Sequence, residues 1–195
     1  TGVQTCALPI LRVTMEWEKI SRDQPIADGR LMFGIVQGST YRDLREKSAE
    51  GLSKMGFDGH AIGGLSVGEP EDKMMEVLDW TVPYLPPEKA RYLMGVGTPA
   101  QIVRAVARGV DMFDCVMPTR LARHGSAFVS GGGTIPIKAA RYREDTGPID
   151  ENCGCPVCAN FSKAYIRHLL NVGEILGQML VTRHNLHFYL GLMRE

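Results

Sequence analysis

The stretch Leu31-Met32-Phe33-Gly34-Ile35-Val36-Gln37-Gly38 is a short apolar run that ends in a polar residue and a glycine. Its length suits a buried β-strand better than a helix. Three similar runs follow it, and stretches of helical length separate them. This alternation is typical of βα units around a parallel sheet, so the sequence predicts an α/β fold. The expected strands are residues 31–36, 60–62, 92–96 and 112–116, and the expected helices are residues 41–55, 70–81 and 99–108.

The composition is that of an ordinary globular chain of 195 residues, of which 44% are hydrophobic and 23% are charged. Such a chain can bury a substantial core and is not disordered. Its 22 Lys and Arg residues balance 22 Asp and Glu residues. This balance excludes binding of nucleic acid through a strong overall positive charge, so any RNA contact must come from a local patch.

The sequence also indicates where in the cell the protein is located. No apolar run is long enough to cross a membrane, so no membrane partner is expected. Of the five cysteines, three form a cluster, and the other two, Cys6 and Cys115, lie far apart in the sequence. This usage indicates reduced thiols and a cytoplasmic protein.

The chain is expected to fall into three parts. Residues 1–13 resemble neither a signal peptide nor a capped helix start, and we expect a truncated or foreign segment that passes into a helix at residues 14–21. Residues 14–123 hold the four βα units, which are either a small open domain or half of an eightfold barrel. Residues 124–195 hold a hairpin, the cysteine cluster and C-terminal helices. The expected hairpin strands are residues 127–129 and 135–137, and the expected helices are residues 159–170 and 173–193.

Three cysteines lie close together in the run Cys153-Gly154-Cys155-Pro156-Val157-Cys158. Disulfides across one or two intervening residues are strained, whereas a tetrahedral zinc ion accepts three such thiolates readily. His184 is favoured as the fourth ligand, because a helix could carry it back to the cysteines. His168 and His187 remain alternative ligands.

Polar groups and glycines gather at the C-terminal ends of the expected strands, where parallel sheets bind ligands. Asp114 is the strongest catalytic candidate, because its carboxylate interrupts the apolar run 112–116 and would be costly to bury without a function. It could instead cap a helix or pair with Arg120 or Arg123. Gln37 offers a donor and an acceptor to the edge of a heterocycle, or it faces water.

Two further features suit a ligand at the same edge. Arg120 and Arg123 follow Asp114 closely and suit contacts to phosphate, although they could be ordinary surface charges. The pair Gly63-Gly64 would let the backbone approach a ligand, although such a pair also marks a tight turn.

Four motifs together resemble the bacterial tRNA-guanine transglycosylase family. They are FGIVQG at residues 33–38, GGLSVGE at 63–69, MGVGTP at 94–99 and DMFDCVMPTR at 111–120. The similarity extends from about Trp17 to Glu195 and includes the cysteine cluster and HNLHFY at residues 184–189. The resemblance implies a (β/α)8 TIM barrel with a zinc-binding subdomain, of which this chain is the C-terminal half.

The resemblance implies a pentosyltransferase that exchanges guanine at the wobble position of tRNA for the queuosine precursor preQ1. Asp114 matches the family's nucleophile, which forms a covalent glycosyl-enzyme. The implied partners are the tRNA anticodon loop, guanine, preQ1 and a second subunit in a homodimer. The family's general acid/base and two further base-binding groups come from the first half of the barrel, so this chain alone is expected to be inactive.

The resemblance also assigns roles to individual residues. Residues that match the family's base-binding groups are Gln37, Gly64, Leu65, Val67, Glu69 and Met94. Residues that match its RNA-contacting segments are Gly95, Val96, Gly97, Thr98, Pro99, Ala100 and Gln101, and then Thr119, Arg120, Leu121, Ala122 and Arg123. The matching ligands of a structural Zn²⁺ are Cys153, Cys155, Cys158 and His184. Val67 favours preQ1, because enzymes of the family that use the larger base queuine have a smaller residue there.

Two other functions are compatible with parts of this pattern. The first is a non-catalytic, zinc-containing tRNA-binding subunit, which the intact motif around Asp114 disfavours. The second is an unrelated barrel enzyme that binds a phosphate at residues 63–64 and 95–97 and needs neither zinc nor tRNA.

Overall fold

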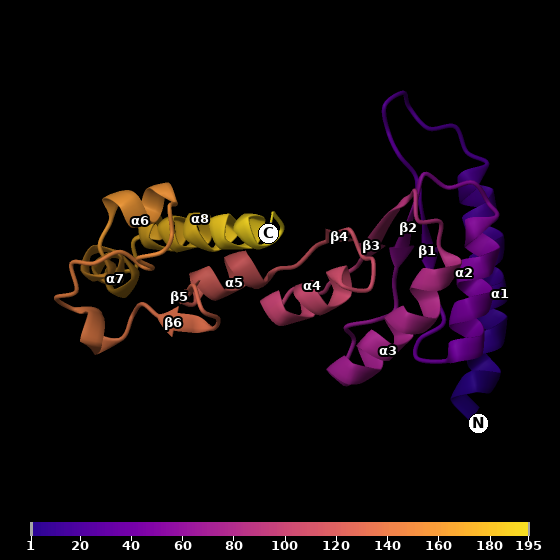
Figure 1. Cartoon of the computed structure of the whole chain (residues 1–195), viewed down its shortest axis with the longest axis horizontal. Coiled ribbons are helices and arrows are strands. Elements are labelled where there is room, and N and C mark those ends of the chain that lie inside the picture. Colours follow the sequence, from indigo (N-terminus) through magenta and orange to yellow (C-terminus); the bar gives the residue numbers. More distant parts are fainter. Residues whose placement is uncertain (1, 195) are drawn as a thin grey trace. The chain divides into compact units, whose positions relative to one another are not determined.

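A computed structural model describes residues 2–194, with side chains from residue 8 onward (Figure 1). The chain divides into two compact units between Cys115 and Val116, whereas the sequence pattern placed a boundary after residue 123. Each unit has its own hydrophobic core. Within the described residues, no helix has both the length and the apolar character that a membrane span requires.

The first unit contains a parallel sheet with the strand order β1-β2-β3-β4. Its strands are β1 (Phe33–Val36), β2 (Gly59–Ile62), β3 (Ala90–Leu93) and β4 (Met112–Phe113). The predicted α/β fold and parallel sheet are therefore confirmed. The last two strands end earlier than expected, so Gly95 and Asp114 lie beyond the sheet rather than inside it.

Four α-helices accompany this sheet. They are α1 (Gly2–Arg22), α2 (Arg42–Ser53), α3 (Glu71–Thr81) and α4 (Pro99–Val106), and a short 3-10 helix, Val82–Tyr84, follows α3. Helix α4 begins with a capping box, in which Thr98 and Gln101 satisfy each other's backbone N–H groups. The core lies between the sheet and the helices, where Ile62 and Leu93 of the strands are fully buried with Leu78 of α3.

Helix α1 is longer than the sequence pattern predicted, since it begins at Gly2 rather than at residue 14. Leu11 is buried and Met15 packs against the core, so the apolar face of the helix continues toward its N-terminus. Glu18 accepts a hydrogen bond of 3.0 Å from the backbone N–H of Ile35. Helix α1 thus covers part of the open edge of β1, which would otherwise expose an unpaired N–H group.

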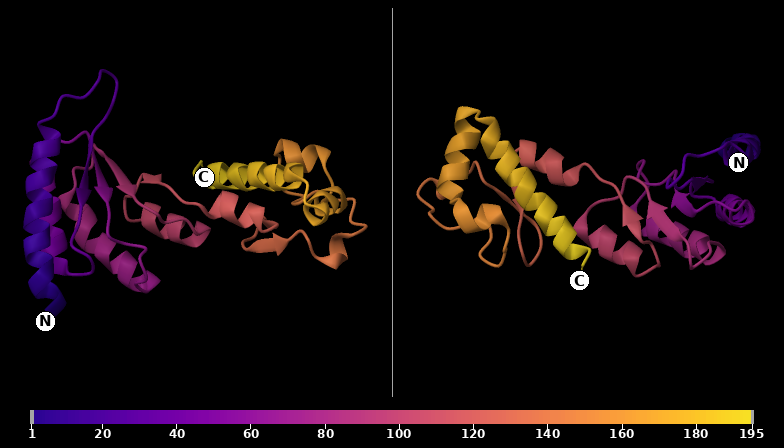
Figure 2. Two further views of the ribbon diagram at one scale, coloured as in Figure 1. Left: turned by 180° about the vertical axis from the view of Figure 1, so that it is seen from behind. Right: turned by 90° about the horizontal axis from the view of Figure 1, so that it is seen from above.

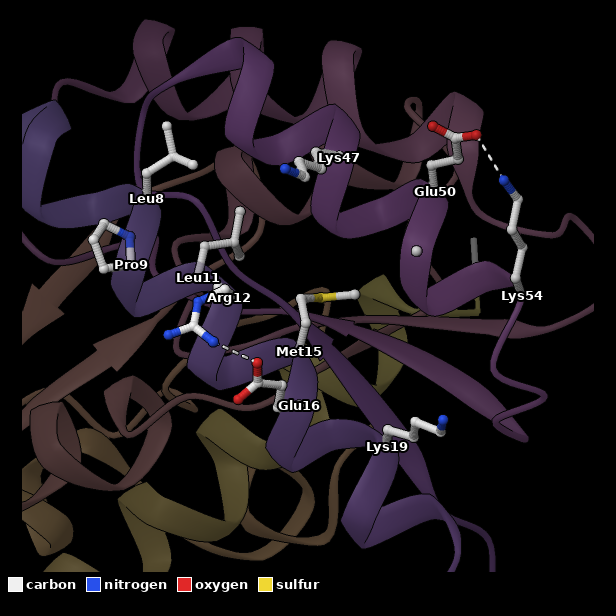
Figure 3. Close-up of a pocket in the computed structure, with 11 residues that line it drawn as sticks. Leu8, Pro9, Leu11, Arg12, Met15, Glu16, Lys19, Lys47, Glu50 and Lys54 are labelled. Atoms are coloured by element: carbon white, nitrogen blue, oxygen red, sulfur yellow. Dashed lines mark hydrogen bonds and ion pairs between the residues drawn. The ribbon is translucent and has the colours of Figure 1, made fainter.

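A groove of about 960 Å³ separates α1 from α2. Figure 3 shows Leu8, Leu11 and Met15 on its α1 side, with Lys47 and Lys54 on its α2 side. None of the predicted catalytic, base-binding or metal-binding residues lines this groove. It is therefore separate from the strand-end site described below.

The second unit consists of a hairpin and four α-helices, seen from two sides in Figure 2. Its elements are α5 (Met117–Arg123), β5 (Ser126–Phe128), β6 (Thr134–Pro136), α6 (Pro156–Asn160), α7 (Lys163–Val172) and α8 (Ile175–Leu192), with a 3-10 helix at Ala140–Tyr142. The antiparallel pairing of β5 with β6 confirms the predicted hairpin. Gly173 ends α7 in the left-handed conformation, with a φ of 82°.

His60 on β2 makes the stability of the first unit sensitive to acid. Its side chain is fully buried, and neither ring nitrogen has a hydrogen-bond partner. Burial lowers the pKa of His60 below its usual value and outweighs the nearby Leu52 backbone, which raises this pKa, and the charges of Lys89 and Arg91 lower it further. The unfolded chain therefore binds a proton that the folded chain does not, and stability falls as the pH drops through about 6.5 toward the lowered pKa.

We expect His60→Phe to reduce this loss of stability, because phenylalanine fills the site without a titratable group. The measurement is the drop in thermal unfolding midpoint between about pH 7.5 and about pH 5.5. The drop should be smaller in the variant than in the parent, whereas His124→Phe, at an exposed position, should behave like the parent. Equal drops in the parent and His60→Phe would contradict the assignment.

Candidate metal centre and strand-end site

The structure brings three cysteines and one histidine together in the second unit. The ligand atoms of Cys153, Cys155, Cys158 and His184 all lie within 4.8 Å of one another. The Nδ1 atom of His184 lies 3.7, 3.5 and 3.3 Å from the three sulfur atoms in chain order. The alternative ligands His168 and His187 are exposed on the surface, so the prediction of His184 is confirmed.

The elements around this cluster orient its ligands. Cys155 precedes α6 and accepts the backbone N–H of Cys158 at 3.3 Å. The Nε2 atom of His184 lies 2.7 Å from the carbonyl oxygen of Phe128, so this nitrogen carries the proton. The Nδ1 lone pair therefore faces the sulfur atoms, as it does when a backbone carbonyl orients a metal-bound histidine.

These donors suit a zinc ion. Burial lowers the pKa of His184, so the imidazole is neutral, as a metal ligand must be. Burial raises the pKa of the Cys158 thiol to about 12, and a bound cation would take the place of the thiol proton. Four protein ligands complete a tetrahedral shell and leave no position for a reacting water, so the cluster suits structural zinc.

Asp114 lies just after β4, at the C-terminal edge of the sheet. Its side chain is exposed, so the expectation of a buried carboxylate was wrong, because β4 ends at Phe113. Oδ1 accepts hydrogen bonds from the Tyr92 hydroxyl at 2.7 Å and from the Gly95 N–H at 2.8 Å. The Tyr92 bond and then the Gly95 bond hold the pKa of Asp114 below its usual range, so the carboxylate is ionised. No side chain caps α5, so Asp114 is not a helix cap.

Sequence reasoning missed Tyr92 as a partner of Asp114. Tyr92 pairs in register with Met112, and we expect Tyr92→Phe to raise the pKa of Asp114 because the carboxylate loses its hydroxyl donor. An NMR titration of the Asp114 carboxyl carbon measures this shift. Tyr84→Phe, which removes a hydroxyl elsewhere on the first unit, is the control. An unchanged Asp114 pKa in Tyr92→Phe would show that the bond does not stabilise the charge.

Gln37 and Gly64 meet at the same edge. A Cβ atom on Gly64 would come within 2.8 Å of the Gln37 side-chain oxygen, and the φ of Gly64 is +65°. A side chain at position 64 would therefore be both crowded and strained. Gln37 lies against this glycine turn rather than pointing away from it, which favours its predicted role over the alternative of a residue that merely faces water.

Arg45, which no sequence motif predicted as part of the site, stabilises this turn. It is fully buried on α2 and donates to the carbonyl oxygens of Val36, Ser39 and Gly64 at 3.3, 2.6 and 3.2 Å. Burial lowers its pKa to about 10, so it remains charged at neutral pH. Its position on the apolar face of α2, one turn before the buried Ala49, was the available signal.

The loop after β2 joins the glycine turn to Asp114. Glu69 accepts the backbone N–H groups of Ser66 and Val67, the latter at 3.0 Å. The Ser66 hydroxyl donates to the carbonyl oxygen of Gly95 at 3.2 Å, and the Gly95 N–H binds Asp114. Hydrogen bonds therefore connect Glu69 through Ser66 and Gly95 to Asp114, and Gln37 and Gly64 lie at the ends of the two strands before Gly95. Val67 is 82% exposed, whereas the Leu65 side chain is buried in the core.

The two predicted RNA-contacting segments lie in different units. In the first, Val96 is buried in the core, Gly97 packs against Cys115, and residues 99–101 form the first turn of α4. The second, residues 119–123, forms most of α5. Arg120 and Arg123 are exposed on this helix, so it presents two positive charges.

The chain matches known proteins over nearly its whole length. A family model described as queuine tRNA-ribosyltransferase matches residues 7–195. The chain is 54% identical over 187 residues to a queuine tRNA-ribosyltransferase of Dechloromonas aromatica, which covers 95% of this chain and 50% of the relative. It is 52% identical over 184 residues to one of Rickettsia bellii, which covers 94% of this chain and 51% of the relative. The chain thus spans about half the length of these curated relatives.

Proposed function

Since the chain belongs to the queuine tRNA-ribosyltransferase family, we propose that its whole protein is a tRNA-guanine transglycosylase. The enzyme would exchange guanine at wobble position 34 of tRNA for preQ1. The observation that carries the proposal is the ionised Asp114, held by Tyr92 and Gly95 at the strand edge that also presents Gln37 and Gly64.

In this reaction Asp114 is the nucleophile. With the target nucleotide flipped out of the RNA, the carboxylate attacks C1′ of the ribose as the bond from C1′ to N9 of guanine breaks. The result is a covalent glycosyl ester on Asp114 and a free guanine. The incoming base then attacks the same carbon and releases the carboxylate, so two inversions give retention. A group in the first half of the barrel gives a proton to the leaving guanine, and the same group then takes the proton that the incoming base loses from its attacking nitrogen.

The base would bind beside Asp114 at the glycine turn. Gln37 and the backbone of Gly64 and Leu65 would read its edge, and Met94 would pack against its face. Glu69 would lie near the cationic aminomethyl group of preQ1, where its carboxylate attracts positive charge. Val67 would leave too little room for the larger base queuine.

The remaining expectations belong to the same proposal. The parallel strands would be the second half of a (β/α)8 barrel, and the second unit would be its zinc-binding subdomain. The family's part of the chain would begin at residue 7 rather than at residue 14. The enzyme would be a cytoplasmic homodimer that contacts the anticodon loop through residues 95–101 and through α5. Zinc at the Cys3His cluster would be structural and would take no part in the exchange.

Labelled guanine tests the proposal. Residues 14–195 are joined to the first half of the Dechloromonas aromatica relative, and this extended protein is compared with the present chain. We expect the extended protein to incorporate label into unmodified tRNA and the present chain to incorporate none. If the extended protein binds zinc and tRNA but incorporates no label, the chain is better described as a non-catalytic tRNA-binding subunit.

A further inference from the structure

Asn185 has a buried side chain that takes no part in the proposed reaction. It follows His184 on α8 and is fully buried. Its Nδ2 group donates to the carbonyl oxygens of Pro118 and Ser126 at 3.0 and 3.1 Å, and its Oδ1 accepts the N–H of Phe128 at 3.0 Å. One side chain thus joins α8 to α5 and to both ends of β5, and both of its amide hydrogens are used.

His184, a residue of the candidate metal centre, also contacts β5. His184 donates to the carbonyl oxygen of Phe128, and Asn185 accepts the N–H of that residue. The ring of Phe128 stacks on Phe188 of α8, with centroids 5.3 Å apart. Consecutive residues of α8 therefore fix the last residue of β5, and one of the two is a metal ligand.

Helix α5 depends on such contacts for its position. It spans only Met117–Arg123, and an isolated helix of this length is not stable in water. Ala122 is fully buried in the core of the second unit, and Asn185 binds the carbonyl oxygen of Pro118 in the first turn. These two contacts therefore determine the direction in which the exposed side chains of Arg120 and Arg123 point.

We propose that Asn185 is a positioning residue that couples the metal centre to helix α5. Metal binding fixes His184, the rigid helix α8 carries this constraint to the neighbouring Asn185, and Asn185 holds α5 and β5. If the proposed function is correct, the metal thereby sets the direction of two arginines that contact the RNA, although it lies outside the chemistry. The coupling itself is a property of this chain and does not depend on that function.

Amide hydrogen exchange in the zinc-bound chain tests the coupling. In Asn185→Ala, the amides of Arg120 and His124, which bond within α5, should exchange at least about tenfold faster, because local opening becomes easier. The amides of α7 should keep their protection, and zinc should still bind one ion per chain. Asn160→Ala is the matched control, because Asn160 also donates to a backbone carbonyl, that of Pro156 on the ligand-bearing helix α6, but has no bond to α5.

Two further readouts separate positioning from general stability. Coupling is reciprocal, so Asn185→Ala should weaken zinc affinity, measured by competition with a chelator, while Asn160→Ala should not. In the extended protein, Asn185→Ala should raise the KM for tRNA and leave the KM for guanine unchanged. Asn185→Asp, which keeps the acceptor for Phe128 but loses both donors, should show the same pattern if Asn185→Ala does not fold.

Unchanged exchange at α5, or faster exchange spread evenly over α6 and α7, would overturn the coupling. An unchanged KM for tRNA would overturn the inference that the coupling sets the direction of Arg120 and Arg123 toward the RNA. An extended protein without any base exchange would refute the proposed function instead, and the exchange and zinc measurements on the present chain would still decide the inference.

Discussion

Replacing Asp114 with asparagine in the extended protein should lower base exchange by on the order of 10⁴-fold or more, as expected for loss of a nucleophile. The neutral amide cannot form the glycosyl ester. The fold should survive, because Asp114 is exposed and an asparagine oxygen can still accept from Tyr92 and Gly95. Labelled-guanine incorporation measures the loss, and circular dichroism checks the fold.

Asp111→Asn is the matched control for this experiment. Asp111 is exposed just before β4 and accepts the backbone N–H of Arg91 at 2.8 Å, so its carboxylate lies at the N-terminal end of the strand that Asp114 follows. Its replacement should leave exchange within a few-fold of the parent, since surface substitutions have small effects. If Asp114→Asn kept more than a tenth of the parent's activity, Asp114 would not be the nucleophile.

Removal of the metal should unfold the second unit. Structural zinc sites contribute on the order of 10 kcal/mol to folding, more than the whole stability of many domains. The cysteines of the cluster lie in or against the core that also contains Val157, Ile166 and Val181. We therefore expect a chelator, or His184→Ala, to abolish the helical signal of α7 and α8, as measured by circular dichroism and by amide exchange.

His187→Ala provides the control for metal loss. His187 lies on the same helix but is exposed, so its replacement should leave zinc content and helicity unchanged. The core of the first unit contains none of the four ligands, and its helices should persist after chelation. Full helicity of α7 and α8 in metal-free protein would contradict a structural role for the cluster.

Local patterns were sufficient for much of this fold. The apolar runs before Gln37 and before Asp114 predicted parallel strands, because a buried strand of such a sheet reads as an apolar run. The cysteine spacing predicted the metal cluster, since ligand spacing is a property of the sequence itself. The choice of His184 over two other histidines needed the resemblance, and the structure then confirmed it by burial and distance.

Other features depend on contacts between distant residues, which the local sequence does not show. Arg45 and Asn185 are polar residues on apolar helix faces, and only their backbone partners explain why they are buried. Burial of Asp114 was wrongly expected, because an apolar sequence context does not show where a strand ends. Helix α1 begins earlier than predicted, and Leu11, on the part of the helix that the sequence pattern did not predict, is buried.

The claim that Asp114 forms a covalent glycosyl-enzyme can be tested by capturing that intermediate. The extended protein is incubated with an unmodified anticodon stem-loop while released guanine is removed enzymatically, so that the first step cannot reverse, and the mixture is then denatured. The claim predicts an adduct whose mass equals protein plus RNA minus guanine, attached at Asp114 and absent from Asp114→Asn. Base exchange without this adduct, or an adduct on any other residue, would contradict it.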